Sequence, residues 1–509
     1  MSNIVRLWVG SVFLALMGCV SSPGQAAATT KLEGEWLFDP TPSYPGVTLV
    51  ELSTHDGRVT GSVTTTWYGP MPMQNLRIAG NVVTFELRNL NDRANPVRRW
   101  SAELQAQRLT LTGDLWTSHV VQSGLRGTRA EAQQRRFQLA DLPPLALLEP
   151  DHLAATPPMG WSSWNKFAEH IDDPTVRAMA DWLVTSGLRE VGYVYLNIDD
   201  GWQGERDANG ALHPNQRFPD MKALAAYVHA RGLKLGIYSS PGPRTCAGYT
   251  GSYGHVAQDA RTFADWGIDY LKYDLCSGEW FYSDADTVKR SYAEMGAALR
   301  ATGRPIVYSL CEYGRFNVGT WGRSVGGHLW RTTGDIEDKY ASMARIGFDT
   351  NGDPANAGPG GWNDPDTLEI GNGGMSDEEY RTHLTLWSMS AAPLLMGHDL
   401  RLTSASAAAL LANREVIAVD QDAAGIQGRA VRKTGAIEIW SRKLADGSVA
   451  VAGFNRDTSA AVMSFQAADA GFTTLTSVRD LWRHVERNAD ATTIDVPGHG
   501  AVLLKVAGR

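Results

Sequence analysis

The sequence predicts an α/β fold: a (β/α)8 barrel of the TIM type, flanked by an N-terminal all-β domain and a C-terminal antiparallel β-sandwich. Between residues 156 and 412, eight short apolar runs alternate with segments of helical periodicity, which is the pattern of such a barrel. Strand-like runs without helical spacing dominate on either side of that region. A chain of 509 residues is long enough for these three domains.

The N-terminal domain is expected over residues 32–130. Strand-like runs at 47–52, 58–67, 82–87, 99–104 and 108–115 are separated by turn pairs such as Asp56-Gly57 and Gly80-Asn81. The pattern predicts a small antiparallel sandwich or barrel. Its role stays open between a carbohydrate-binding accessory and a structural addition.

A proline-rich linker is expected at residues 131–155, before the barrel at 156–412. The predicted barrel strands are 159–164, 193–199, 233–239, 270–273, 306–310, 328–331, 362–370 and 392–396. Apolar residues at helical spacing predict helices at 174–186, 221–231, 255–266 and 284–301. Most of the strands end near polar or aromatic side chains, as expected where a barrel enzyme holds its active site.

The helical pattern is expected to stop at about residue 413, where the C-terminal domain (413–509) begins. Strand-like runs at 430–441, 448–455, 461–465 and 501–506 predict an antiparallel β domain.

Residues 1–26 resemble an export signal. Arg6 precedes an apolar run at 7–18 that is too short to span a bilayer comfortably. The run ends in LMGC at 16–19, which resembles a bacterial lipoprotein cleavage box with Cys19 as the lipidated residue. Cleavage after Ala26 or Ala27 by an ordinary signal peptidase is the alternative. The protein is therefore expected to be exported, either secreted or held as a periplasmic or outer-membrane lipoprotein that meets the membrane only through Cys19.

Composition narrows the range of ligands. A net charge of −8 without a long basic run argues against nucleic acid as a partner. The twelve histidines are scattered and no C-x-x-C pair occurs, so neither a metal site nor a cofactor is expected. The 17 tryptophans would suit stacking on sugar rings, although burial in a large core is the ordinary explanation for most of them.

Two carboxylates close separate strand-like runs in the predicted barrel. Asp274 ends the run at 270–274, and alternation along a strand places Lys272 on the same face. Asp335 closes the run that begins at Leu329. Glycoside hydrolysis uses such a pair of carboxyl groups. The competing interpretation is that each aspartate only caps the following helix.

A series of ordered motifs from residue 156 onward resembles glycoside hydrolase family 27, the α-galactosidase family. The motifs are TPPMGWSSWN at 156–165, NIDDGW at 197–202, RFP at 217–219, GLKLGIY at 232–238, TCAG at 245–248, KYDLC at 272–276, WRTTGDI at 330–336 and GGWNDPD at 360–366. The resemblance covers residues 156–509 and leaves the N-terminal domain outside it.

The resemblance implies a retaining double displacement, with Asp274 as the nucleophile and Asp335 as the acid/base. Retention requires the two carboxyl groups to lie roughly 5–5.5 Å apart. Asp274 must stay ionised, and Lys272 and Arg331 are expected to favour its charged form. Asp335 must hold a proton at the working pH.

The remaining pocket residues are implied by motif position. Asp199 and Asp200 match the paired acids that bind the 4- and 6-hydroxyls of the sugar. Cys246 and Cys276 match an active-site disulfide of the family, which would leave Cys311 free. The other matched sugar contacts are Trp164, Tyr238, Lys272, Glu312, Arg331 and Asp366.

The chain departs from the family at three places. Gly201 stands where many members have cysteine, Tyr313 follows Glu312 where tryptophan is common, and Thr367 replaces a frequent methionine. Glu312 argues against an N-acetyl group at the 2-position of the sugar.

The leading hypothesis is an exported retaining α-galactosidase acting on oligo- or polysaccharides. The near alternative is a β-L-arabinopyranosidase or a mixed-specificity member of the same family. A non-catalytic sugar-binding lipoprotein would be expected to lack Asp274 or Asp335, and both are present.

Overall fold

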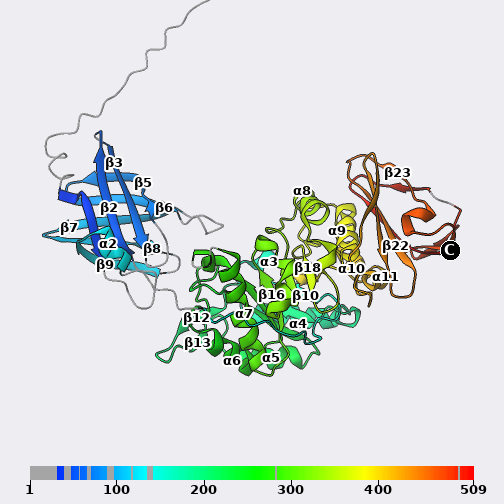
Figure 1. Cartoon of the computed structure of the whole chain (residues 1–509), viewed down its shortest axis with the longest axis horizontal. Helices are drawn as coiled ribbons and strands as arrows, with labels where there is room; N and C mark the ends of the chain where they lie inside the picture. Colours follow the sequence, from blue (N-terminus) through cyan, green and yellow to red (C-terminus); the bar gives the residue numbers. More distant parts are fainter. Residues whose placement is uncertain are drawn as a thin grey trace, which may run out of the picture. The chain divides into compact units, whose positions relative to one another are not determined.

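The structure is a computed structural model that describes residues 31–38, 47–56, 58–65, 70–88, 97–115, 118–134, 142–280, 282, 284–490 and 493–509. The chain divides into two compact units, residues 1–138 and 139–509 (Figure 1). Within the described ranges, every helix is too short or too polar to cross a bilayer. The predicted export signal at 1–26, including Cys19, lies outside the described residues.

The first unit contains one antiparallel sheet of nine strands in the order β4-β3-β2-β1-β9-β8-β7-β6-β5. The strands are β1 (Gly34–Phe38), β2 (Val47–His55), β3 (Arg58–Thr65), β4 (Met71–Pro72), β5 (Gln74–Ala79), β6 (Val82–Arg88), β7 (Val97–Gln105), β8 (Arg108–Leu115) and β9 (Ser118–Arg126). The two edge strands, β4 and β5, are joined by the single residue Met73. Because neighbouring strands lie about 4.8 Å apart, a flat sheet could not join its edges in this way. The sheet therefore curls on itself, which favours the barrel of the two predicted forms.

Alternation along the strands builds the core of this unit. In β6, Val83, Phe85 and Leu87 are buried, while the residues between them are more exposed. Trp36 and Trp100 join them in one apolar cluster. A short helix, α2 (Arg129–Gln134), follows β9.

The second unit is built around an eight-stranded parallel sheet in the order β18-β17-β16-β15-β14-β11-β10-β19. The strands are β10 (Met159–Ser162), β11 (Tyr195–Asn197), β14 (Lys234–Ser239), β15 (Tyr270–Asp274), β16 (Val307–Cys311), β17 (Leu329–Arg331), β18 (Trp362–Asp364) and β19 (Leu394–Met396). Leu368, which follows β18, bridges to Met396 of β19 and so joins the two edges of the sheet. The predicted (β/α)8 barrel is confirmed.

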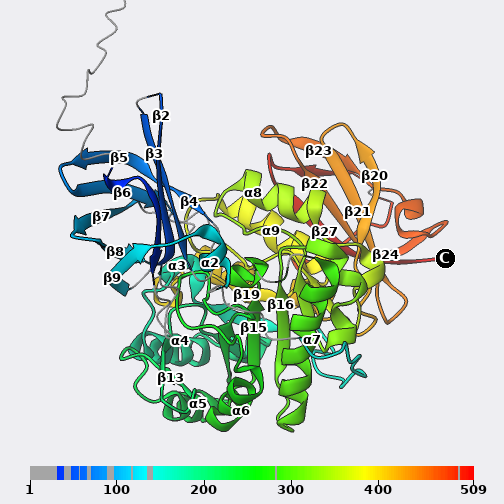
Figure 2. The ribbon, with the colours of Figure 1, turned by 60° about the vertical axis from the view of Figure 1, so that its left-hand side comes forward.

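Helices surround these strands, with α4, α5, α6 and α7 on the outside of the sheet (Figures 1 and 2). The α-helices are α3 (Trp164–Phe167), α4 (Asp173–Thr185), α5 (Met221–His229), α6 (Val256–Trp266), α7 (Ala285–Ala301), α8 (Tyr340–Ala344), α9 (Asp377–Met389), α10 (Ala405–Leu411) and α11 (Arg414–Asp420). Shorter elements are the hairpin β12 (Gln203–Arg206) and β13 (Leu212–Pro214), the 3-10 turns η1 (Arg189–Val191), η2 (Cys276–Trp280), η3 (Arg315–Thr320), η4 (Gly322–Val325), η6 (Pro354–Asn356) and η7 (Leu400–Leu402), and the π-helical turn η5 (Arg345–Thr350).

Local sequence signals explain where the long helices begin and end. The side chains of Asp172, Asp220 and Asp284 each accept a backbone N–H at the start of α4, α5 and α7. Helix α6 ends at Gly267, whose φ of 88° lies in the left-handed region that glycine adopts without strain. The strands therefore return to the same end of the sheet after each helix.

The C-terminal part contains an antiparallel sheet in the order β20-β21-β22-β27-β24-β25 and a second, two-stranded sheet of β23 and β26. The strands are β20 (Arg429–Thr434), β21 (Ile437–Lys443), β22 (Val449–Asn455), β23 (Ala461–Ser464), β24 (Leu475–Asp480), β25 (Val485–Arg487), β26 (Thr493–Val496) and β27 (Ala501–Gly508), with a 3-10 turn η8 (Ala467–Ala470). Met463 and Ile494 of the small sheet share one apolar cluster with Val451 and Leu504 of the large one. The two sheets form the predicted β-sandwich.

Two details of the C-terminal prediction are wrong. The helices do not stop at residue 413, because Asn413 caps a further helix, α11, with its side chain. The helix packs beside α9, where Val416 and Ile417 are buried. The run 430–441 is not one strand, because Gly435, with φ of 59°, makes the turn between β20 and β21. A hairpin turn flanked by strand-forming residues on both sides resembles a single strand in the sequence.

Candidate active site

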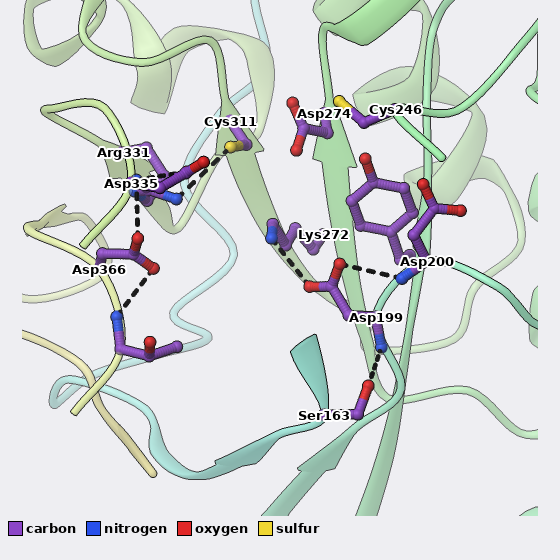
Figure 3. Close-up of polar contacts among 12 residues, drawn as sticks. Ser163, Asp199, Asp200, Cys246, Lys272, Asp274, Cys311, Arg331, Asp335 and Asp366 are labelled. Carbon is purple, nitrogen blue, oxygen red and sulfur yellow. Dashed lines mark hydrogen bonds and ion pairs between the residues drawn. The ribbon is translucent and has the colours of Figure 1, made fainter. Parts of the chain in front are cut away.

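The predicted site residues gather at the carboxyl ends of the parallel strands. Asp274 and Arg331 are the last residues of β15 and β17. Parallel strands present their carboxyl ends at one edge of the sheet, so these side chains share one face of the barrel (Figure 3). The residues that follow strands at this edge are Trp164, Asp199, Asp200, Glu312, Asp335 and Asp366.

Asp199 is fixed by contacts to both of its carboxylate oxygens. Lys272 Nζ donates to Oδ2 at 2.8 Å, and the backbone N–H of Asp200 donates to Oδ1 at 2.9 Å (Figure 3). The backbone N–H of Asp199 itself donates to Ser163 Oγ at 2.9 Å. Burial disfavours the charge on Lys272, but Asp199 outweighs it and, with other nearby groups, raises the pKa of Lys272. The pair is therefore an ammonium–carboxylate pair.

Asp200 lies beside this pair in a different environment. Its Oδ2 accepts a 2.7 Å hydrogen bond from the backbone N–H of Ala247, while Oδ1 is buried without a partner among the described residues. Burial raises the pKa of Asp200 to about 7, and the neighbouring Asp199 and Asp274 carboxylates add to that shift. A buried polar atom without a protein partner is unusual, and it suits a hydroxyl donor on a ligand.

Asp274 is 3% exposed and accepts a hydrogen bond from a neighbouring tyrosine. The hydroxyl of Tyr313 donates to Asp274 Oδ1 at 2.7 Å. The donor–acceptor distance is that of a well-formed O–H···O hydrogen bond. Sequence reasoning treated Tyr313 only as a departure from the family pattern and missed this contact.

Cys246 and Cys276 form a disulfide, as predicted, and Cys311 is free and buried. The hydroxyl of Tyr238 lies 3.0 Å from Cys276 Sγ, and Lys272 Nζ lies 5.2 Å from the centre of the Tyr238 ring. Ligand atoms of Cys246, Cys276 and Asp274 lie within 4.8 Å of one another. Because the two sulfurs are bonded to each other, they do not offer thiolates to a metal ion.

Glu312 follows β16 and is fully buried. Its Oε1 accepts from the backbone N–H of Gly314 at 3.0 Å, and Oε2 has no partner among the described residues. Burial raises the pKa of Glu312 to about 8, although the Gly314 N–H and Arg331 oppose the shift. The uncharged carboxyl can both donate and accept a hydrogen bond.

Arg331 joins the acidic residues on the other side of the site. Its Nη2 lies 3.0 Å from Asp335 Oδ1 and 2.9 Å from Asp366 Oδ2 (Figure 3). The backbone N–H of Ile336 also donates to Asp366 Oδ2, at 3.0 Å. Burial disfavours the charge on Arg331, but Asp366 and its neighbours outweigh it and raise the pKa of Arg331. One guanidinium thus holds both carboxylates in place.

Asp335 does not cap the helix that follows it. The N-cap of α8 is Lys339, and that cap makes no side-chain hydrogen bond. Asp335 is half-buried and its contact with Arg331 holds it at the site. The helix-cap interpretation of this residue is therefore wrong.

Trp164 is half-buried at the start of α3, directly after β10. The next residue, Asn165, donates to the side chain of Glu369, which follows β18. Burial raises the pKa of Glu369 to about 7. This contact ties the short helix that carries Trp164 to the neighbouring loop.

One further acidic residue of the site was not predicted from the sequence, although it lies in the GGWNDPD motif. Asp364 ends β18, and its Oδ1 accepts from the backbone N–H of Asp366 at 2.9 Å. Burial raises the pKa of Asp364 to about 6, with Arg331 acting in the opposite direction. Its position at a strand end was the signal that could have identified it.

The chain matches two family models. Residues 156–422 match the model described as alpha galactosidase A, and residues 434–506 match the alpha galactosidase C-terminal beta sandwich domain. The first match spans the barrel through α11, and the second spans most of the C-terminal strands.

Known proteins resemble the chain over the same region. An alpha-galactosidase of Cyamopsis tetragonoloba is 48% identical over 338 residues, which cover 65% of this chain and 81% of that protein. The crystal structure of alpha-galactosidase I from Mortierella vinacea superposes with a TM-score of 0.67 at 35% identity, covering 70% of this chain and 98% of the other. A candidate alpha-galactosidase from Bacteroides fragilis superposes with a TM-score of 0.66 at 32% identity over 93% of this chain and 98% of its own.

Proposed function

Because this chain belongs to glycoside hydrolase family 27, the α-galactosidase family, we propose that it removes terminal α-D-galactosyl residues from oligo- or polysaccharides. The relatives' names support galactose as the sugar. The proposed reaction is a retaining double displacement carried out by Asp274 and Asp335.

The position of these two carboxylates carries the proposal. Asp274 ends β15 and Asp335 follows β17, with only β16 between the two strands. Two strands so related lie about 10 Å apart, so side chains that lean toward each other leave room for one sugar ring between them. Two carboxyl groups flanking the anomeric carbon are what double displacement requires.

The two carboxylates would act in turn. In the first step, Asp274 attacks C1 of the sugar while Asp335 gives its proton to the departing oxygen. In the second, Asp335 takes a proton from water, whose oxygen bonds to C1 and displaces Asp274. Arg331 holds Asp335 in reach of both leaving group and water.

The Asp199–Lys272 pair and Asp200 supply the recognition that galactose needs. Carboxylate oxygens in a buried site accept hydrogen bonds from sugar hydroxyls, and a sugar with a misplaced hydroxyl would leave an acceptor unpaired. Asp200 Oδ1, which lacks a partner among the described residues, supports this role.

Export is proposed on the sequence of residues 1–26 alone. Cells grown with labelled palmitate should incorporate label into the protein, and Cys19→Ser should abolish that labelling. Secretion of an unlabelled protein would instead favour cleavage near Ala26.

A panel of aryl glycosides tests the proposed activity. The purified protein should hydrolyse aryl α-galactosides faster than β-L-arabinopyranosides and α-N-acetylgalactosaminides. Faster turnover of the arabinopyranoside, which shares the ring hydroxyls but lacks C6, would replace galactose with arabinopyranose as the substrate. If none of the three aryl glycosides is hydrolysed, the proposed function is overturned.

A further inference from the structure

The contact between Tyr313 and Asp274 has a consequence for the second step of the reaction. Resting on the function proposed above, we infer that Tyr313 is a positioning residue that holds Asp274 through its hydroxyl and speeds release of the sugar from the covalent intermediate. The side chain of Tyr313 brings a hydroxyl donor to the end of β15.

The hydrogen bond decides which oxygen can react. Tyr313 donates to Oδ1 of Asp274 at 2.7 Å, and the carboxylate is buried at the end of β15. A bond to Oδ1 fixes rotation of the carboxylate, so Oδ2 is the oxygen left to attack C1. The same hydroxyl lies 3.5 Å from Cys246 Sγ, which places it between the nucleophile and the disulfide.

The backbone around Tyr313 is shaped to make this contact. Cys311, at the end of β16, lies opposite Asp274 in the strand pairing, and Tyr313 comes two residues later. Tyr313 has a φ of 64°, a conformation that is strained for a non-glycine residue. Gly314 follows with a φ of 79°, and a Cβ there would lie 2.2 Å from the carbonyl oxygen of Thr332.

Side-chain contacts stabilise this turn. Gly314 donates its backbone N–H to Glu312 Oε1, and Arg315 lies 5.8 Å from the centre of the Tyr313 ring. Arg315 is paired in turn with Glu279. Strain held by surrounding contacts is characteristic of functional positions.

This hydrogen bond is expected to stabilise the transition state of the second step more than that of the first step. In the second step the bond between C1 and the Asp274 oxygen breaks, and its electron pair returns to the carboxylate. A water oxygen bonds to C1, Asp335 receives the water proton, and Tyr313 keeps its own. Charge on Asp274 grows toward this transition state, so a hydrogen bond to the carboxylate strengthens. In the first step the same charge is consumed, and the bond weakens.

The variant Tyr313→Phe keeps the ring and removes only the hydroxyl. With an activated dinitrophenyl α-galactoside, kcat should fall about tenfold, which corresponds to about 1.4 kcal/mol. KM should fall with it, while kcat/KM, which reports the first step, should change less than about threefold. A stopped-flow burst of dinitrophenol should appear or grow, and added methanol should raise kcat by attacking the intermediate.

The matched control is Tyr227→Phe. Tyr227 lies on the outer helix α5, and its hydroxyl donates to the Asp181 carboxylate at 2.9 Å. The variant therefore makes the same chemical change away from the site. This variant should keep wild-type kinetics, and thermal melts should show both variants folded.

Two outcomes would overturn the role of Tyr313. An equal loss of kcat and kcat/KM without a burst would mean that the hydroxyl acts on both steps or on packing alone. Wild-type kinetics in Tyr313→Phe would mean that the bond is without consequence. If the wild-type enzyme hydrolyses α-galactosides, either result leaves the proposed function intact. An inactive wild-type enzyme would refute the proposed function instead.

Discussion

Lys272 Nζ donates a 2.8 Å hydrogen bond to Oδ2 of Asp199, which lies 73 residues earlier in the chain. The sequence had associated Lys272 with Asp274, two positions further along the same strand. Asp199 follows β11, and β14 lies between β11 and β15 in the sheet, yet the long lysine side chain reaches across at the carboxyl ends. The counter-charge thus serves Asp199 directly.

Replacing Lys272 with methionine should lower the free energy of unfolding by about 3 kcal/mol, because Asp199 is buried and would lose its cation. Adding Asp199→Asn should recover most of that stability, since an amide needs no counter-charge. Denaturant unfolding of the single and double variants measures both effects. The single and the double variant should both be poor catalysts. An equal loss of stability in the single and the double variant would contradict the pairing of Lys272 with Asp199.

Asp274→Ala should abolish turnover of aryl α-galactosides, because no covalent intermediate can form. Azide should restore part of the activity by replacing the missing carboxylate, and the product should be a glycosyl azide of inverted configuration. Product analysis by NMR checks the anomeric centre. Activity like that of the wild type would remove Asp274 from the mechanism.

Asp335→Ala should affect substrates according to their leaving groups. In natural galactosyl oligosaccharides the leaving-group oxygen needs a proton as it departs, so their hydrolysis should fall by about 10²- to 10⁴-fold. Activated aryl galactosides should react in the first step with a smaller loss, and the intermediate on Asp274 should accumulate. Mass spectrometry of the denatured enzyme detects it. Equal losses on both substrate types, with no trapped intermediate, would rule out the acid/base role.

Asp200 should make stability depend on pH. Because burial raises its folded pKa from 3.8 to about 7, the folded state binds the extra proton in this window and the free energy of unfolding falls as pH rises across it. Asp200→Asn removes that titration. The melting temperature of the variant relative to the wild type should therefore rise by several degrees between pH 4 and pH 7, as thermal melts at each pH would show.

Asp181→Asn provides a control of opposite sign for this pH series. Burial opposes ionisation of Asp181, but hydrogen bonds from Arg231 and Tyr227 outweigh it and lower its pKa. The stability from that carboxylate is present above its unfolded pKa of 3.8 and is lost as pH falls below it. When the series is extended below pH 4, the melting temperature of Asp181→Asn relative to the wild type should therefore rise as pH falls, and it should stay nearly constant above about pH 5. A relative melting temperature for Asp200→Asn that stays flat with pH would contradict the assigned shift.

Much of the barrel could be predicted from local patterns. The apolar runs that became β14, β15 and β16 lie within one or two residues of their predicted bounds, because a buried parallel strand needs a continuous apolar stretch. Helices α4 and α5 begin within one residue of their predicted starts at 174 and 221, and in the structure the side chains of Asp172 and Asp220 cap them. Helix α11 and the turn at Gly435 were missed because their signals are short and resemble the neighbouring segments.

The sequence by itself determined that polar residues stand at the ends of the barrel strands, and it determined the family resemblance. The resemblance in turn implied the pairing of Cys246 with Cys276. Only the tertiary structure decided which charges meet. Lys272 pairs with Asp199, Arg331 holds both Asp335 and Asp366, and Tyr313 reaches Asp274. The physical reason is that strand register and a left-handed turn after β16 bring together side chains from separate strand ends. A linear pattern carries the residue types but not the direction in which each side chain points.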